Sequence, residues 1–251
     1  MIGFRTLLYK EIRRFLRVPG QTVAQPVVMT SLYFLVFGFA LGGRVRELDG
    51  VPYGHFIVPG LVALSVIQNA FLNTSSSMFV MKLQGTIIDL LVAPLSPGEI
   101  LAAFVLGGMA RGILVGGIVW LCASAFVGFH LAHALWALAF LLLVSATFSF
   151  LGLVVAIWSE KFEQLNIVPA FVLVPLTFLG GVFYSVALLP APWSTITRWN
   201  PILYMVEGLR FGLLGAGSEA PAFGLGLTAG LCAAVGGLCY WMLASGYRLR
   251  K

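Results

Sequence analysis

Residues 166 to 215, NIVPAFVLVPLTFLGGVFYSVALLPAPWSTITRWNPILYMVEGLRFGLLG, begin as a membrane span and then change character. Residues 166–186 carry no charge, but Pro169 and Pro175 interrupt the apolar run. Proline removes a backbone donor, and a membrane helix tolerates it where neighbouring protein satisfies the freed backbone groups. This half therefore predicts a membrane helix that is buried in a bundle.

The second half, residues 190–215, carries Arg198, Glu207 and Arg210. Its apolar run, residues 201–206, is far too short to cross roughly 30 Å of hydrocarbon. We expect a re-entrant outer segment, in which short helices enter the membrane and return without crossing it. Glu207 and Arg210 are three residues apart on such a helix, so their side chains can satisfy each other.

The composition excludes a soluble globular domain. Hydrophobic residues make up 60% of the 251 residues and charged residues 10%, whereas a soluble domain carries about 25% charged residues. The chain has room for about six helical spans of roughly 20 residues each. We therefore expect an all-α, polytopic membrane protein with one transmembrane domain, residues 1–251.

Apolar runs and the residues that interrupt them divide the chain into six predicted spans. An amphipathic helix, residues 3–17, precedes the spans, and segment 82–99 contains one short cytoplasmic helix, residues 86–92. The predicted spans are residues 21–43, 56–81, 100–129, 134–158, 166–186 and 221–245.

Residues 3–17 place apolar side chains at helical spacings of three and four, and Pro19 and Gly20 end the pattern. Such a helix lies in the membrane interface. It is either a plain anchor or also a surface that docks a cytoplasmic partner. Its polar face carries Arg5, Lys10, Glu11, Arg13, Arg14 and Arg17.

The lower half of the second predicted span is unusually polar. In lipid these side chains would leave hydrogen-bonding groups without partners. They must therefore face protein or a cavity. The residues are Gln68, Asn69, Asn73, Thr74, Ser75, Ser76 and Ser77.

The third predicted span combines small residues with one charge. Gly108, Gly112 and Gly116 recur every four residues, a pattern that lets two membrane helices approach closely. Arg111 would cost at least about 2.5 to 3.5 kcal/mol if it were unpaired in the membrane. It must find water, a carboxylate or a lipid phosphate, and Glu99 or a carboxylate on another helix would also explain it.

The net charge of +6 follows from topology and requires no nucleic-acid partner. Lys and Arg concentrate in the predicted cytoplasmic segments, as the positive-inside rule requires. Both chain ends are therefore expected in the cytoplasm. The basic residues assigned to the outer side are Arg44, Arg46, Arg198 and Arg210.

Motifs for catalysis and for nucleotide binding are absent from the sequence. It contains no GxxxxGK[ST] loop, no G-x-S-x-G elbow and no H-E-x-x-H helix. His130 and His133 lack a nearby third ligand, so we expect no metal site. None of the nine acidic residues lies clearly within a span, which disfavours ion coupling. We expect no enzyme, and transport energy must come from a partner.

Six blocks of sequence together resemble the permease subunits of type-2 ABC exporters, the class that includes bacterial drug, polysaccharide and lipo-oligosaccharide exporters. The blocks, in chain order, are KEIRRFLR, FIVPGLV, IIDLLVAPLSPGEI, GGMARG, PLTFLGGVFYSVALLP and WNPILYMVEGLR. The resemblance implies a bacterial inner-membrane protein with six spans. It also implies a second permease copy, and two separate subunits that bind ATP and Mg²⁺.

By that resemblance, residues 3–17 form an interface helix and residues 86–92 a coupling helix, and both rest on the ATP-binding subunit. This chain itself is expected to hold no cofactor. The residues predicted to couple it to its partner are Lys10, Glu11, Arg13, Arg14, Thr86, Ile87, Asp89 and Leu90.

For the export path we select Asn69, Asn73, Arg111, Phe183 and Tyr184. Arg111 either contacts an anionic headgroup or serves structural pairing. We expect an amphipathic, lipid-like or drug-like substrate, with a polysaccharide or glycolipid as the alternative within the class. An alternative of another class is a secondary carrier or channel that needs no motor.

Overall fold

The computed structural model describes residues 2–41, 47–217 and 220–249. The predicted outer charges Arg44 and Arg46, and the last residues of the first predicted span, lie outside this part of the chain.

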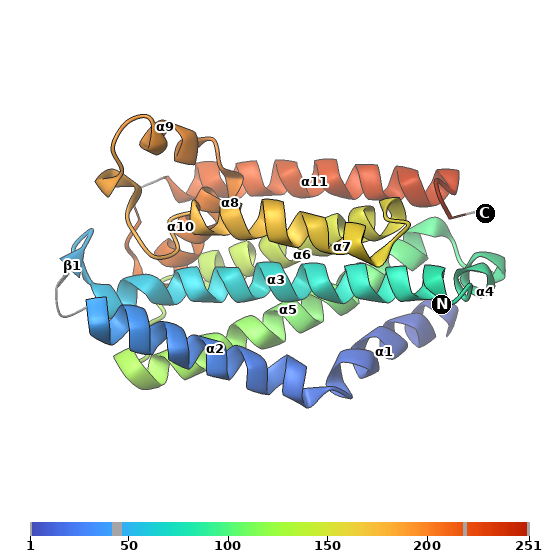
Figure 1. Cartoon of the computed structure of the whole chain (residues 1–251), viewed down its shortest axis with the longest axis horizontal. Coiled ribbons are helices and arrows are strands. Elements are labelled where there is room, and N and C mark those ends of the chain that lie inside the picture. The colour runs from blue at the N-terminus through green and yellow to red at the C-terminus, as the bar shows by residue number, and fades with distance from the viewer. Residues whose placement is uncertain (1, 42–46, 218–219, 250–251) are drawn as a thin grey trace.

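Helices run side by side along the long axis of the molecule (Figure 1). Four of those described are long and apolar enough to cross a membrane by length and composition. The last two match their predicted boundaries residue for residue. The four are α3 (Tyr53–Leu83), α5 (Pro97–Val127), α6 (Ala134–Trp158) and α11 (Pro221–Ser245).

The first and fifth predicted spans are instead built from short consecutive helices. The first consists of the π-helix η1 (Gly20–Ala24), α2 (Gln25–Tyr33) and the π-helix η2 (Phe34–Leu41). The fifth consists of α7 (Phe162–Val168), the π-helix η3 (Pro169–Leu173) and α8 (Val174–Phe178).

A proline lies at the start of α2, η3 and α8. Because proline lacks the N–H that the helical ladder needs, the regular hydrogen-bond pattern shifts at these points. The fifth helical run ends at Phe178, short of the predicted residue 186. The glycines at 180 and 181 fall in the turn that follows.

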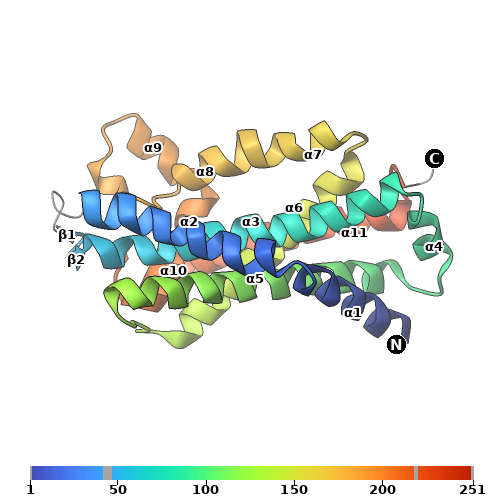
Figure 2. The same ribbon diagram turned by 60° about the horizontal axis from the view of Figure 1, so that its bottom comes forward.

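The two ends of the bundle differ in structure. The amphipathic helix α1 (Ile2–Leu16) starts, and α11 ends, at the end that also holds α4 (Ile87–Val92) (Figures 1 and 2). The opposite end holds a small antiparallel hairpin, β1 (Glu47–Leu48) and β2 (Val51–Pro52). The hairpin was not predicted, although Asp49-Gly50, with φ of 51° and 77°, is a typical tight-turn pair.

The predicted re-entrant segment forms two short helices at the hairpin end, α9 (Trp193–Arg198) and α10 (Pro201–Leu214). Trp193 and Trp199 are exposed, whereas most of α10 is buried. Arg210 was assigned to the outer charges, but only 1% of it is exposed. α10 packs inside the bundle against α6 and α3, so Arg210 lies within the protein and is not an exposed loop charge. The 3₁₀ turn η4 (Val186–Leu188) precedes both helices.

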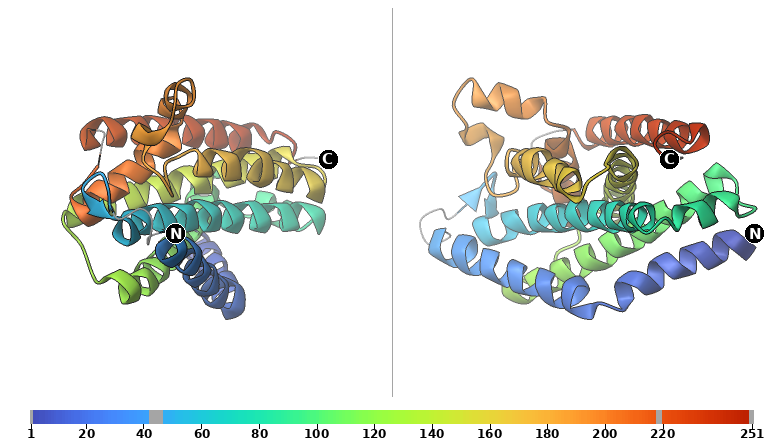
Figure 3. Two further views of the ribbon diagram at one scale, coloured as in Figure 1. Left: turned by 60° about the vertical axis from the view of Figure 1, so that its left-hand side comes forward. Right: turned by 45° about the vertical axis from the view of Figure 1, so that its right-hand side comes forward.

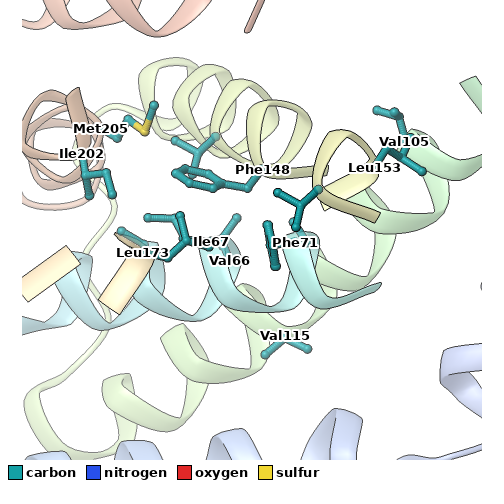
Figure 4. Packing of buried hydrophobic residues seen from close by; sticks show 14 of the residues in the cluster. Val66, Ile67, Phe71, Val105, Val115, Phe148, Leu153, Leu173, Ile202 and Met205 are labelled. Carbon is teal, nitrogen blue, oxygen red and sulfur yellow. The ribbon is translucent and has the colours of Figure 1, made fainter. Parts of the chain in front are cut away.

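The central helix is α3, which packs against α5, α6 and α10 (Figure 3). Figure 4 shows Ile67 and Phe71 of α3 facing Phe148 of α6, with Ile202 and Met205 of α10 nearby. Of the residues that α3 contributes to the bundle, Phe56 to Leu64 are all buried. Burial of this apolar surface between helices forms the core.

The small residues of α5 make the close approach to α3 that their spacing predicts. A Cβ added to Gly112 would lie 3.1 Å from Cβ of Ala70, and one added to Gly116 would lie 2.5 Å from Cγ2 of Val66. On Gly108 it would meet the side chain of Thr74 at 2.6 Å. The predicted packing role of these glycines is confirmed.

Candidate transport site and coupling surface

Arg111 lies near the middle of α5 with 5% of its surface exposed. Within the described residues it makes no hydrogen bond and no ion pair, and its Nε atom is buried without a partner. Arg111 does not pair with Glu99, one of the alternatives that the sequence left open: Glu99 lies in the first turn of the same helix, where it accepts hydrogen bonds from the backbone and hydroxyl of Ser96 at 2.9 and 3.1 Å. This capping box starts α5.

Arg111 lines a cavity of about 110 Å³ between η1, α2, α3 and α5. Asn69, predicted to belong to the same path, lines it too. The structure therefore brings two of the five predicted path residues together. The polar lining is completed by Gln21, Gln25, Thr30, Tyr33, Ser65 and Gln68, and the apolar lining consists of Pro26, Met29, Leu61, Leu64 and Leu72.

Asn73, the third predicted path residue, is fully buried in the contact between α1 and α3. Nη2 of Arg14 donates to its backbone oxygen at 2.7 Å and to its Oδ1 at 2.9 Å. Its Nδ2 is buried without a partner. Asn73 thus binds Arg14 of α1 and does not line the cavity.

Glu11, which the sequence placed on the polar face of the amphipathic helix, is also fully buried. Ser77 donates to its Oε1 at 2.8 Å, and Arg14 Nε lies 3.4 Å from its Oε2. Gly107 makes room, because an added Cβ there would lie 2.8 Å from Cβ of Glu11. This part of the polar face therefore meets the polar stripe of α3, which offers the carboxylate a partner inside the protein.

Phe183 and Tyr184 lie toward the hairpin end, in the turn after α8. The ring of Phe183 stacks on Phe37 with 4.4 Å between centroids, and the centroid of Tyr33 lies 5.5 Å away. Tyr33 lines the cavity as well. A group of aromatic rings therefore lies next to the polar cavity, with Phe183 buried, Tyr33 and Phe37 partly buried and Phe178 exposed.

The residues predicted to couple the chain to a partner divide into two groups. Lys10 and Arg13 of α1, and Thr86 and Asp89 at α4, are exposed, and Arg14 is partly exposed. The remaining residues, Glu11, Ile87 and Leu90, are buried against the rest of the chain. The first group is available to a partner, and the second attaches α1 and α4 to the bundle.

Lys82, at the end of α3, makes a connection that sequence reasoning missed. Its Nζ donates to the backbone oxygens of Ala156, Ile157 and Ser159 at 3.2, 2.6 and 2.8 Å. A cation at a helix C-terminus satisfies the last carbonyls of that helix and interacts favourably with its dipole. Lys82 therefore joins the start of segment 82–99 to the end of α6. A lysine directly after a long apolar run was the available signal.

Glu207 and Arg210 form the ion pair that their spacing predicted. Arg210 also donates to the backbone oxygen of Gly181 at 2.8 Å, and its guanidinium lies 3.8 Å from the centroid of Phe56. The pair thus fastens α10 to α3 and to the turn after α8.

Four long apolar helices, with a small polar cavity between η1, α2, α3 and α5, define the class as a multi-pass membrane protein. The chain belongs to the ABC-2 type transporter family, whose model matches residues 3–214. It is 39% identical over 250 residues to the inner membrane transport permease YadH of Escherichia coli K12, covering 100% of this chain and 98% of that protein.

Nodulation proteins J are more distant relatives. The one from Sinorhizobium fredii is 28% identical over 193 residues, covering 76% of this chain and 72% of that protein. The one from Rhizobium meliloti strain 1021 is 26% identical over 186 residues, covering 74% of this chain and 71% of that protein.

Proposed function

We propose that this chain is the membrane-spanning permease subunit of an ATP-driven exporter in the bacterial cytoplasmic membrane. Two copies enclose the path, and two separate ATP-binding subunits, which hold ATP and Mg²⁺, supply the energy. The observation that carries the proposal is full-length similarity to an inner membrane transport permease, combined with exposed polar residues on α1 and α4 at one end of the bundle.

The proposed topology has six spans and both chain ends in the cytoplasm. The run from Gly20 to Leu41 is long enough for the roughly 20 residues that a span needs. The run from Phe162 to Phe178 is shorter, and we propose that the turn after it completes the crossing within the protein. The shared placement of α4, the start of α1 and the end of α11 supports this orientation.

Two sets of hydrogen bonds support a route by which movements of the ATP-binding subunits reach the membrane helices. Lys82 joins segment 82–99 to the end of α6, and Glu11 with Arg14 joins α1 to α3. A push on α4 would therefore reach α6 through the end of α3 and Lys82, and a push on α1 would reach α3. When ATP closes the partner subunits, these movements rock the two permease copies and open the path outward.

An amphipathic, lipid-like or drug-like cargo suits the described interior better than a polysaccharide. The rings of Phe37 and Phe183 stack on each other and are not arranged as an open platform for sugar rings. Beside them lies a polar cavity with apolar walls, which suits a molecule with one polar end.

Reconstitution tests the proposal. The chain is purified alone and together with its proposed ATP-binding subunit, and both preparations are placed in liposomes loaded with a fluorescent amphiphile. We expect efflux that requires the second subunit and ATP. Equal efflux from liposomes that contain the chain alone would support a motor-independent carrier instead.

A further inference from the structure

The cavity at Arg111 has a positive charge that no described residue neutralises. Arg111 forms no ion pair within the described residues, and the charged side chain that acts on it electrostatically is Arg14, which has the same sign. Arg14 is itself offset by Glu11 at 3.4 Å. Because a buried unpaired charge costs free energy, an anion next to Arg111 would stabilise it.

The groups around the charge include donors that an anion can use. Arg111 presents only donors, and the amides of Gln21, Gln25 and Gln68 line the same space. Asn69 already uses its Nδ2 to donate to the backbone oxygen of Ser65 at 3.0 Å. The cavity volume of about 110 Å³ is well above the roughly 10–15 Å³ that a single water needs.

The residues at the opening of the cavity indicate what kind of group is attached to the anion. Gln21, Gln25 and Gln68 are exposed, so the cavity opens to the surface between α2 and α3. Met29 and Leu72 line it as well and are 45% and 47% exposed. A polar interior next to exposed apolar side chains suits a charged headgroup inside and an alkyl chain outside.

We propose that this cavity binds the phosphate group of an anionic amphiphile, with Arg111 as its charge partner. Guanidinium and phosphate form paired, charge-assisted hydrogen bonds, which are stronger than bonds between neutral groups. The phosphate belongs either to the exported molecule or to a resident membrane lipid. The assignment to cargo rests on the proposed export function, whereas binding itself does not.

The first test measures binding without any partner subunit. The purified chain in neutral detergent is titrated with phosphatidic acid and with phosphatidylcholine of the same chain length, and native mass spectrometry gives the affinities. We expect tighter binding of phosphatidic acid, and a loss of about tenfold or more in Arg111→Gln, because charge-assisted bonds are removed. Arg111→Lys keeps the charge and should retain part of the preference.

Arg198→Gln is the matched control, because Arg198 is an exposed arginine at the hairpin end, away from the cavity lining. It should bind like the unmodified chain. Equal affinities in Arg111→Gln and in Arg198→Gln would overturn the proposal. Competition by millimolar inorganic phosphate as effective as that by phosphatidic acid would also overturn it, since the site would then be one for the free ion.

A second measurement separates the two sources of the phosphate. In the complex with the ATP-binding subunit, phosphatidic acid should stimulate ATP hydrolysis through Arg111 if the amphiphile is cargo. Binding without stimulation supports a resident lipid at the same site. If the complex hydrolyses no ATP and exports nothing, the proposed function fails while the binding result stands.

Discussion

Oε1 of Glu11 on α1 accepts a hydrogen bond of 2.8 Å from the hydroxyl of Ser77 on α3, inside the protein. A carboxylate on an amphipathic helix thus attaches that helix to the central helix of the bundle. Removing it should leave the hydroxyl of Ser77 without its acceptor and Arg14 without its counter-charge, although Arg14 keeps its hydrogen bonds to Asn73.

Glu11→Ala should therefore destabilise the protein by about 1–3 kcal/mol, the usual cost of leaving buried polar groups unsatisfied. Glu163→Ala, which changes an exposed carboxylate, is the control and should change stability by less than about 0.5 kcal/mol. Thermal unfolding in detergent measures both. A double-mutant cycle with Ser77→Ala that yields no coupling energy would contradict the assigned contact.

The buried pair Glu207 and Arg210 should show the asymmetry of buried ion pairs. Arg210→Met leaves Glu207 without its partner guanidinium and should cost about 3–5 kcal/mol, whereas changing both residues to apolar ones should restore part of the loss. Arg198→Met changes an exposed arginine and should have little effect. If the double variant is no more stable than Arg210→Met in thermal unfolding, the pair does not hold α10 as described.

Gly152 on α6 lies at a close contact with α3 that leaves no room for a side chain. An added Cβ would lie 2.5 Å from the backbone oxygen of Phe71 and also against Thr74. Because backbone cannot move aside, Gly152→Ala should destabilise by about 1–3 kcal/mol. Gly117, on α5, has no atom within 4 Å of its added Cβ, so Gly117→Ala should be neutral or stabilising by up to about 1 kcal/mol. Equal unfolding midpoints for the two variants would be the contrary result.

The connection through Lys82 should affect both stability and coupling. Lys82→Met removes three hydrogen bonds to the end of α6 and should cost about 1–3 kcal/mol. In the reconstituted complex, export per ATP hydrolysed should also fall, because the end of α3, from which the chain continues into α4, loses its link to α6. Lys161→Met, at a nearby exposed lysine, should preserve both. A variant of Lys82 that exports normally per ATP would exclude this route.

Long, uninterrupted apolar runs made much of the fold predictable from the sequence. The bounds of α6 and α11 match their predicted spans, and α4 begins one residue after the predicted start of its helix. The fifth span was harder, because hydropathy continues past Phe178 while the helix ends there. Hydropathy measures the preference for lipid and does not report where prolines and glycines interrupt the backbone.

The candidate site shows a different limit. The sequence identified Arg111 and Asn69 as unusual in a membrane, and the structure places both at one cavity. Helical periodicity placed Glu11 on the polar face of its helix but did not indicate that it is buried. Periodicity separates polar from apolar faces, but it cannot show that a polar face meets the polar stripe of another helix. The contacts of Lys82 could not be predicted from the sequence either, because its acceptors belong to a helix more than 70 residues away.

The most direct test of the account is the ratio of export to ATP hydrolysis in proteoliposomes that contain both subunits. Asp89→Lys reverses an exposed charge on α4, and Glu47→Lys reverses an exposed charge at the hairpin end of the bundle. We predict that Asp89→Lys keeps ATP hydrolysis but lowers export by about tenfold, within the range of coupling between distant sites, and that Glu47→Lys keeps both. Unchanged export per ATP in Asp89→Lys would contradict the claim that α4 couples this permease to its motor.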